Sequence, residues 1–293
     1  MFDTLFAPLF ATPWLLFTAV AFISLCIGSF LNVVILRLPK MMEQDWRCQC
    51  EEFLELPEEG RKPAETVTLS SPASTCPSCG HKIRPWENIP VISYVLLKGQ
   101  CASCKTGISP RYPVIEAVTA VFSLVTVAVI GPSYAALWAL LLVWTLVALT
   151  VIDFDTQLLP DSMTLPLMWL GLVLNYFNTF TDFNSAFWGA VAGYLSLWSV
   201  YWLFKLVTGK EGMGHGDFKL LAALGAWLGW ELLPAVILLS SVVGAVVGIT
   251  LIALRNHGRE VPIPFGPYLA AAGLLCLWFG ADILVAWYAY LGV

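Results

Sequence analysis

Residues 134–155 read YAALWALLLVWTLVALTVIDFD, an uncharged apolar run that ends at two aspartates. As a helix rising 1.5 Å per residue, the run 134–152 is long enough to cross most of the ~30 Å hydrocarbon core of a bilayer. The first carboxylate, Asp153, directly follows the apolar run and therefore lies at the end of a predicted membrane helix. Because an unpaired charge there is energetically costly, Asp153 is a candidate functional residue.

The composition of the whole chain agrees with a membrane location. Of its 293 residues, 58% are hydrophobic and only 12% are charged, whereas soluble domains carry about 25% charged residues. We therefore expect an all-α polytopic membrane protein with about eight transmembrane helices. These helices are predicted at residues 12–36, 113–130, 134–152, 163–180, 185–204, 218–230, 235–254 and 267–291. The run 218–230 is short for a crossing, and a re-entrant segment is the alternative there.

Positive charge is confined to one set of the predicted connections. Ten of the fifteen Lys and Arg residues lie between Arg37 and Arg111. If the chain crosses the membrane at every predicted helix, all fifteen lie on one side, which the positive-inside rule assigns to the cytosol. Both termini then lie on the opposite side. No basic residue precedes the first apolar run, which favours a retained anchor over a cleaved signal peptide.

The predicted helices divide the chain into three regions. Residues 1–36 contain the first transmembrane helix, residues 37–112 form a small cytosolic insertion, and residues 113–293 form a membrane core of seven helices. The first half of the insertion is rich in Glu and predicts a short amphipathic helix followed by a linker. Its second half contains most of the cysteines.

Two CxxC pairs, separated by 21 residues, predict a zinc site in this insertion. Each pair can place two thiolates on one tight turn, and two such turns can surround a tetrahedral Zn²⁺ ion. A reducing cytosol favours metal binding over disulfides, although a redox-active CxxC pair is the alternative. The other cysteine pair in the insertion, Cys48 and Cys50, lies outside this spacing and has no assigned role. The predicted ligands are Cys76, Cys79, Cys101 and Cys104.

A second candidate carboxylate, Asp217, lies in the segment GMGHGDFKLL at residues 212–221. The predicted topology places Asp217 on the same side of the membrane as Asp153, at a similar depth. Two adjacent carboxylates can share one proton, so that one acts as general base and the other as general acid in aspartyl proteolysis. Glycines before Asp217 leave room for a substrate strand to approach the backbone. These glycines are Gly212, Gly214 and Gly216.

Other roles are open for the carboxylates of this chain. Helix capping is the favoured role of Asp161 and the alternative for Asp217, while Asp155 is expected on a different face from Asp153. Proton or metal-ion transport is the competing function. Transporters usually place such groups near the midplane of the membrane and often contain repeated halves. Here the carboxylates lie near one face and no internal repeat is visible.

With these features, the chain resembles the type IV prepilin leader peptidase/N-methyltransferases, which are membrane aspartyl proteases of the GxGD kind. The resemblance extends along nearly the whole chain and includes both CxxC pairs. The other matching stretches are GSFLNVVILRLPK at 28–40, RYPVIEA at 111–117, DFDTQLLPD at 153–161, GMGHGDFKLLAALGAWLGW at 212–230 and PIPFGPYLA at 262–270.

The resemblance implies a bifunctional enzyme of the bacterial inner membrane, with Asp153 and Asp217 as its catalytic pair. It implies cleavage of the basic leader of type IV prepilins or type II secretion pseudopilins after Gly at the cytosolic face. Such enzymes then methylate the new N-terminal residue, often Phe, with S-adenosylmethionine. Peptidase activity alone is the alternative within the family. The expected partners are these substrates and membrane lipid, not nucleic acid, and both termini are expected in the periplasm. No glycine-rich signature marks the S-adenosylmethionine site, whose residues remain unassigned.

Overall fold

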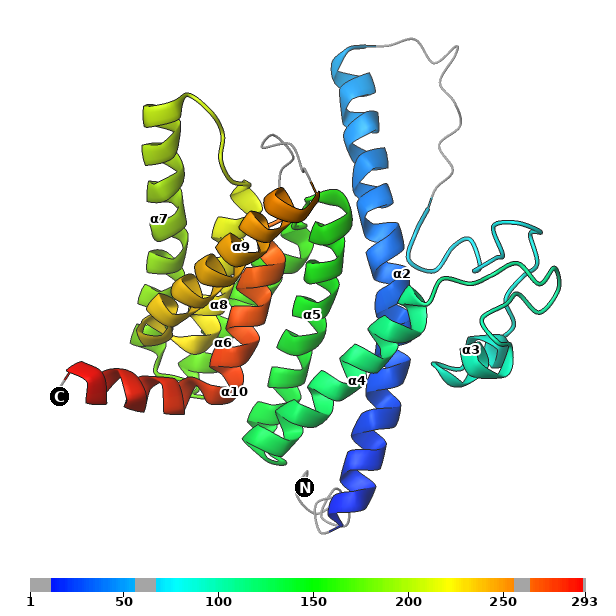
Figure 1. The fold of residues 1–293 in the computed structure, drawn as a ribbon, viewed down its shortest axis with the longest axis horizontal. Helices are drawn as coiled ribbons and strands as arrows, with labels where there is room; N and C mark the ends of the chain where they lie inside the picture. Colours follow the sequence, from blue (N-terminus) through cyan, green and yellow to red (C-terminus); the bar gives the residue numbers. More distant parts are fainter. Residues whose placement is uncertain (1–11, 56–66, 256–263, 292–293) are drawn as a thin grey trace. The chain divides into compact units, whose positions relative to one another are not determined.

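The computed structural model describes residues 12–55, 67–255 and 264–291 of the chain (Figure 1). These residues form two compact units that divide between Ala128 and Val129. Within the described ranges, all regular elements are helices, apart from isolated bridges at Thr75–Lys82 and Gln100–Gly107. The prediction of an all-α protein is confirmed.

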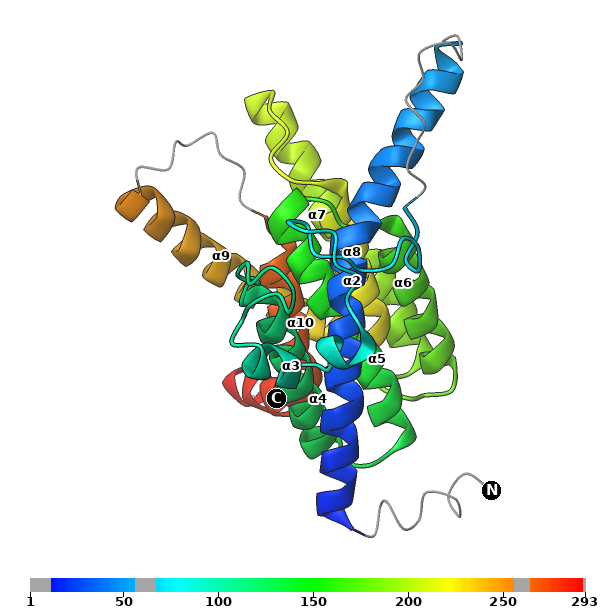
Figure 2. The ribbon, with the colours of Figure 1, turned by 90° about the vertical axis from the view of Figure 1, so that its right-hand side faces the viewer.

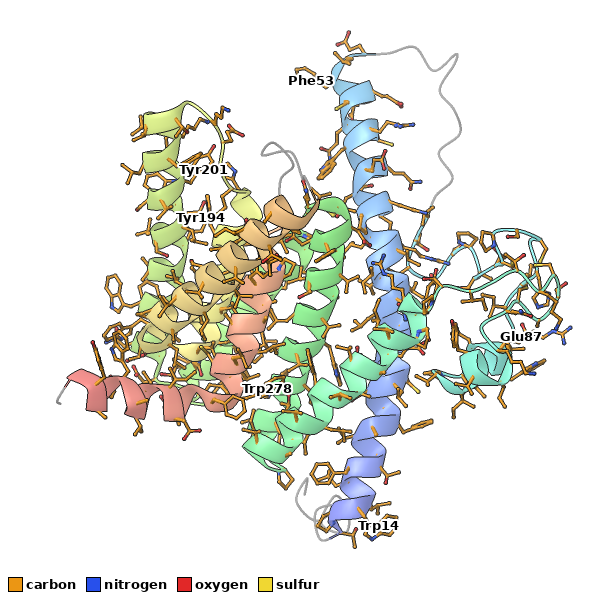
Figure 3. The ribbon with its side chains drawn as sticks, in the orientation of Figure 1. Trp14, Phe53, Glu87, Tyr194, Tyr201 and Trp278 are labelled. Carbon is orange, nitrogen blue, oxygen red and sulfur yellow. The ribbon has the colours of Figure 1, made fainter. Side chains whose placement is uncertain are left out.

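The first unit is built on two long helices, α2 (Pro13–Phe53) and α4 (Arg111–Ile130). A proline is well suited to the first turn of a helix because its missing N–H has no intrahelical acceptor there. From Pro13, α2 continues without a break through Pro39 to Phe53, and Trp14 and Phe53 mark its two ends in Figure 3. The helix predicted in the first half of the insertion is therefore present, but it is the C-terminal part of α2 rather than a short helix of its own.

Hydrogen bonds attach the loop between α2 and α4 to both helices. The guanidinium of Arg37 on α2 donates to the backbone carbonyls of Thr68 at 2.9 Å and Pro72 at 2.6 Å. The buried carboxylate of Glu116 on α4 accepts from the backbone N–H of Val91 at 2.8 Å. The loop also contains η1 (Pro85–Asn88) and α3 (Ile92–Leu96). These contacts fix the cysteine-containing segment against the helices of its own unit.

The second unit surrounds one buried helix, α8 (His215–Leu228), as Figures 1 and 2 show. This helix packs against three of the surrounding helices, α6, α7 and α10. Nearly every side chain from Asp217 to Trp227 is buried. The other elements of the unit are α5 (Tyr134–Thr156), α6 (Asp161–Tyr176), α7 (Phe183–Thr208), η2 (Trp230–Leu232), α9 (Leu233–Arg255) and α10 (Gly266–Leu291).

Small residues allow α7 and α8 to pack with their backbones nearly in contact. A Cβ atom on Gly225 of α8 would collide with the carbonyl oxygen of Gly189 on α7, and one on Gly193 would lie 2.7 Å from the carbonyl oxygen of Leu221. Small residues at such spacing are typical of helix packing in membranes, where close van der Waals contact replaces the hydrophobic effect. This packing fixes the position of α8, and with it the position of Asp217.

In the part of the chain that the structure describes, six helices are long and apolar enough to cross a membrane, namely α2, α4, α5, α7, α9 and α10. The two other predicted spans, 163–180 and 218–230, correspond to α6 and α8, which contain 16 and 14 residues. All eight predicted segments are therefore helical, although two of the helices are shorter than a typical span. A kink at Phe279, where φ is −122° and ψ is 16°, also divides α10 into two parts.

Candidate active site

The helix directions of the second unit bring Asp153 and Asp217 to the same end of the bundle. Asp153 lies in the last turn of α5, and Asp217 lies in the first turn of α8. Both side chains are buried, with exposed fractions of 5% and 6%. Their carboxylates are close enough to interact electrostatically. The structure thus brings to one end of the bundle two residues that are 64 positions apart in the sequence.

The start of α10 holds the Asp153 carboxylate in place. The backbone N–H of Gly266 donates a buried hydrogen bond of 2.9 Å to Oδ2 of Asp153. The first N–H groups of a helix have no intrahelical acceptor, so they are well placed to bind an anion. A Cβ atom on Gly266 would lie only 2.6 Å from the same oxygen. The sequence alone assigns no role to Gly266, because its only local signal is a glycine that opens an apolar run.

Leu159, in the connection between α5 and α6, links the surroundings of the two aspartates. A Cβ atom on Gly266 would lie 3.3 Å from Cδ1 of Leu159, and one on Gly216 would lie 2.7 Å from its Cβ. The same side chain therefore packs against the first turn of α10 and the first turn of α8. This contact seals one side of the carboxylate pair with an apolar group.

One oxygen of Asp217 has no partner in the described protein. Its Oδ1 atom is buried and makes no hydrogen bond. An unsatisfied buried carboxylate oxygen is unfavourable and rare, so water or a bound substrate is expected to interact with it. The capping alternative for Asp217 is wrong, because Gly214 is the N-cap residue of α8.

The capping role predicted for Asp161 is also wrong. Pro160 occupies the N-cap position of α6, and Asp161 makes an ion pair with Lys219 of α8. Both carboxylate oxygens accept from the Lys219 ammonium, at 2.6 Å and 2.7 Å. This pair joins α6 to α8 close to Asp217. Asp155 is exposed where Asp153 is buried, which confirms that the two lie on different faces of α5.

Two of the three glycines before Asp217 allow close packing. A Cβ atom on Gly212 would lie 2.7 Å from the ring of Phe204, and Gly216 faces Leu159 as described above. None of the three glycines has a positive φ. In this structure Gly212 and Gly216 are needed for space rather than for backbone conformation, whereas a Cβ atom on Gly214 would lie an ordinary 3.7 Å from Oδ2 of Asp217. The approach of a substrate strand at this segment stays a prediction.

An aromatic cluster lies beside the first turn of α8. The ring of His215 is 5.0 Å from that of Tyr201 and 5.4 Å from that of Phe218, and Tyr194 packs edge-on against Phe218. Both tyrosines extend from α7, as labelled in Figure 3. His215 is exposed and is the first residue of α8.

The four predicted metal ligands of the first unit form one cluster. The sulfur atoms of Cys76, Cys79, Cys101 and Cys104 all lie within 4.8 Å of one another. The Sγ atoms of Cys76 and Cys104 are 3.8 Å apart, which is about the spacing of two thiolates on a tetrahedral ion with ~2.3 Å bonds. The hydroxyl and backbone N–H of Thr106 lower the pKa of Cys104 to about 6. The cluster therefore suits a metal ion.

The two CxxC turns have the same backbone structure. In the first turn, the N–H of Cys76 donates to the carbonyl of His81, and the N–H of Gly80 donates to the carbonyl of Cys76, both at 2.9 Å. Cys101 makes the equivalent bonds with Thr106 at 2.8 Å and Lys105 at 3.1 Å. Gly80 and Lys105, at matching positions, both have a positive φ. Each turn thus presents its cysteines in the same way, as the repeated spacing predicts.

Comparison with known proteins agrees with this two-part structure. Residues 22–130 match the family model of the bacterial peptidase A24 N-terminal domain, and residues 140–249 match that of the type IV leader peptidase family. Prepilin leader peptidase/N-methyltransferase of Aeromonas salmonicida is 54% identical over 94% of both chains. This chain belongs to the type IV leader peptidase family. The corresponding protein of Pseudomonas aeruginosa is 54% identical over 92% of both chains. That of Stutzerimonas stutzeri is 56% identical over 90% of this chain and 91% of the relative.

The family assignment confirms the resemblance found in the sequence. Both aspartates lie in the region that matches the leader peptidase model, and the four cysteines lie in the region that matches the N-terminal model. The division between the two matched regions agrees with the division of the fold into two units. No solved structure matches this chain.

Proposed function

We propose that this member of the leader peptidase family is a bifunctional prepilin-processing enzyme. It cleaves the basic leader of type IV prepilins or type II secretion pseudopilins after Gly and then methylates the new N-terminal residue, often Phe. The observation that carries the peptidase assignment is the buried pair Asp153 and Asp217, in which one oxygen accepts from Gly266 and another has no partner. The names of the relatives support both activities.

The carboxylate pair supplies a general base and a general acid for peptide hydrolysis. Since the N–H of Gly266 can only donate, it favours the ionised form of Asp153, to which we assign the role of base. Asp153 takes a proton from water while the water oxygen bonds to the scissile carbonyl carbon, and Asp217 donates its proton to the carbonyl oxygen. When the C–N bond breaks, Asp153 returns its proton to the leaving amine and Asp217 recovers one from the tetrahedral intermediate. The leader then ends in a carboxylic acid.

The first unit is proposed to support the methylation step. S-adenosylmethionine, when bound, supplies the methyl group that the deprotonated new amine attacks. The four cysteines suit Zn²⁺, because an all-thiolate tetrahedral site is typical of structural zinc. With this ion bound, the loop anchored by Arg37 and Glu116 has a fixed structure. Peptidase activity alone, with a purely structural metal, is the second possibility within the family.

The distribution of charge supports a location in the bacterial inner membrane. We assign residues 1–36 to the first membrane helix, residues 37–112 to the cytosolic loop domain and residues 113–293 to the protease core. The basic residues then face the cytosol, as does the end of the second unit that carries the aspartates. Both termini face the periplasm, and lipid surrounds the long helices. The scissile bond of a membrane-anchored prepilin lies near the same interface.

Conversion of each aspartate to the isosteric amide tests the assignment. We expect Asp153→Asn and Asp217→Asn each to abolish cleavage of a prepilin peptide with a Gly-Phe junction, measured by mass spectrometry with the purified full-length protein. Asp155→Asn is the matched control, because this neighbouring side chain is exposed, and it should cleave at the wild-type rate. Wild-type cleavage by either of the first two variants would show that the pair is wrongly assigned.

The same reaction with S-adenosylmethionine tests the second activity. The mature product should be heavier by one methyl group. A cleaved product without the methyl group, from zinc-loaded protein, would favour peptidase activity alone. If the wild-type protein cleaves no prepilin at all, the transport function considered for the carboxylates would become the better explanation.

A further inference from the structure

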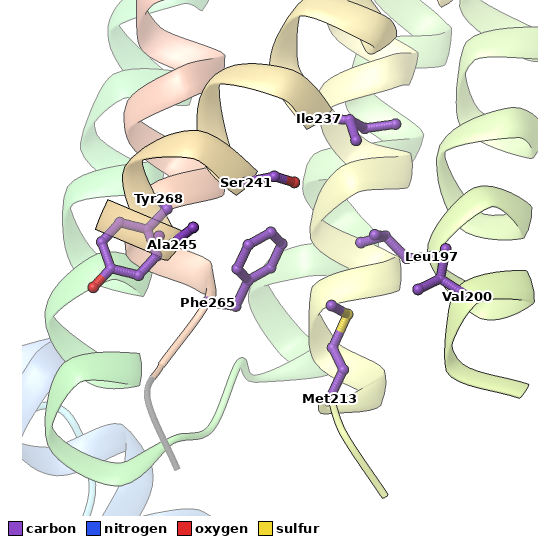
Figure 4. Close-up of a pocket in the computed structure, with 9 residues that line it drawn as sticks. Leu197, Val200, Met213, Ile237, Ser241, Ala245, Phe265 and Tyr268 are labelled. Atoms are coloured by element: carbon purple, nitrogen blue, oxygen red, sulfur yellow. The ribbon is translucent and has the colours of Figure 1, made fainter. Parts of the chain in front are cut away.

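We propose that a cavity between α7, α9 and α10 binds the apolar segment of the substrate that directly follows the scissile bond. The inference rests on the proposed peptidase function and adds the place where the uncleaved membrane-embedded part of the substrate lies. The cavity has a volume of about 360 Å³ and is lined by side chains from these three helices and from the segment before α8 (Figure 4).

Two residues that line the cavity are adjacent in the sequence to the residues that position the proposed catalytic carboxylates. Met213, which lines the cavity, immediately precedes Gly214, the N-cap of the helix that carries Asp217. Phe265, which also lines it, immediately precedes Gly266, whose N–H donates to Asp153. The two segments that position the aspartates therefore form part of the cavity wall. A substrate chain that leaves the carboxylates in this direction enters the cavity at once.

From the carboxylates, the cavity extends along the membrane helices. It contacts α9 at Ile237 and Ala245, which are about 12 Å apart along the helix axis at 1.5 Å per residue. Figure 4 shows Ile237 at the end of the cavity that is farther from Met213. This length accommodates about two turns of helix or about four extended residues. The cavity is therefore long enough to contact several consecutive residues of the substrate.

The chemistry of the wall selects an apolar occupant. Among the residues that the structure describes, no charged side chain lines the cavity, and the polar side-chain groups in its wall are the hydroxyls of Ser241 and Tyr268. Both α7 and α9 are long and apolar enough to cross a membrane, so a basic leader in this position would place unpaired charges among apolar groups. The two hydroxyls can instead pair with backbone groups of a substrate segment that is partly unwound near the cleavage site. The leader is thus excluded, and the segment after the scissile bond fits.

The position of the cavity also allows the substrate to enter laterally, between two of the helices. In the described part of the second unit, α7 and α9 pack against α8 or α10 but make little direct contact with each other. The side chains of Val200 and Ala245, on the two sides of the cavity, are exposed. A membrane-embedded helix can therefore reach the cavity from the side, between α7 and α9. The other possible occupant of this opening is a lipid acyl chain.

Photo-crosslinking tests the proposal without requiring cleavage. The full-length Asp217→Asn variant would be incubated with a prepilin peptide that carries a benzophenone side chain either three residues after the scissile bond or six residues before it. We expect the first probe to label peptides that contain Met213, Leu197 or Ile237, and the second to label none of them. Labelling of other sites only, or equal labelling of the cavity by both probes, would overturn the proposal. Persistent lipid in the cavity in the presence of peptide would overturn it as well.

Filling the cavity gives an independent test. In Ala245→Trp, the larger side chain should raise the KM for a membrane-anchored prepilin about tenfold or more, because the apolar segment is displaced. Val243→Trp is the matched control, because this residue is 47% exposed on the same helix and does not line the cavity. It should keep the wild-type KM, and an unchanged KM in Ala245→Trp would contradict the proposal.

The two tests separate this inference from the peptidase assignment. If the wild-type protein cleaves no prepilin, the proposed function fails, whatever the crosslinks show. If it cleaves normally but Ala245→Trp has no effect and the cavity is not labelled, only the docking site is wrong. If Ala245→Trp does not fold, the crosslinks to the unmodified cavity decide.

Discussion

Gly266→Ala tests whether the first turn of α10 positions the proposed base. The added methyl group would lie 2.6 Å from Oδ2 of Asp153 and 3.3 Å from Cδ1 of Leu159. Both separations are shorter than van der Waals contact, so the carboxylate has to move away. The 2.9 Å hydrogen bond from the Gly266 N–H is then lost.

The size of the effect follows from the kind of bond that is broken. A hydrogen bond to a charged group contributes about 1.5–3 kcal/mol. If that contribution is lost in the transition state, kcat falls about 10- to 160-fold, since about 1.4 kcal/mol corresponds to a tenfold change in rate. The KM of the prepilin should change little, because the proposed contacts of its apolar segment lie in the adjoining cavity.

The assay is the time course of leader release by the purified protein, measured by mass spectrometry at several substrate concentrations. Ala271→Leu is the matched control, because it enlarges an exposed side chain on the same helix and should leave kcat unchanged. Thermal unfolding verifies that both variants are folded at the assay temperature. A folded Gly266→Ala variant with wild-type kcat would refute the idea that this contact positions Asp153.

Three further predictions concern the rest of the protein. Cys79→Ser removes one of four clustered thiols, so it should lower bound zinc, measured by elemental analysis, and impair methylation; normal values of both would contradict the assigned ligand set. Lys219→Met breaks a partly exposed ion pair with Asp161, and a double-mutant cycle on unfolding should give a coupling of at most about 1 kcal/mol; a coupling of several kcal/mol would contradict this. Gly189→Ala forces a methyl group against the carbonyl of Gly225 and should lower the unfolding free energy by about 1–3 kcal/mol, which an unchanged Tm would disprove.

Local features of the sequence predicted the helices and the cysteine cluster well. Membrane helices have a minimum apolar length, and each CxxC turn is closed by hydrogen bonds within a few residues, so both are encoded by short segments. The C-terminal limit of the first helix was harder to predict. Pro39 removes only one backbone hydrogen bond from α2, and its presence in the sequence did not show that the helix continues to Phe53.

The site itself needed the tertiary structure. The sequence predicts that Asp153 and Asp217 lie at helix ends on one side of the membrane, because an apolar run determines where a helix ends. The sequence could not show that the N–H of Gly266, 113 residues away, donates to Asp153. It also could not show that Asp161 pairs with Lys219, 58 residues away, instead of capping α6. The first contact depends on the packing of α10 against α5 and the second on the packing of α6 against α8, and no local sequence pattern encodes either arrangement.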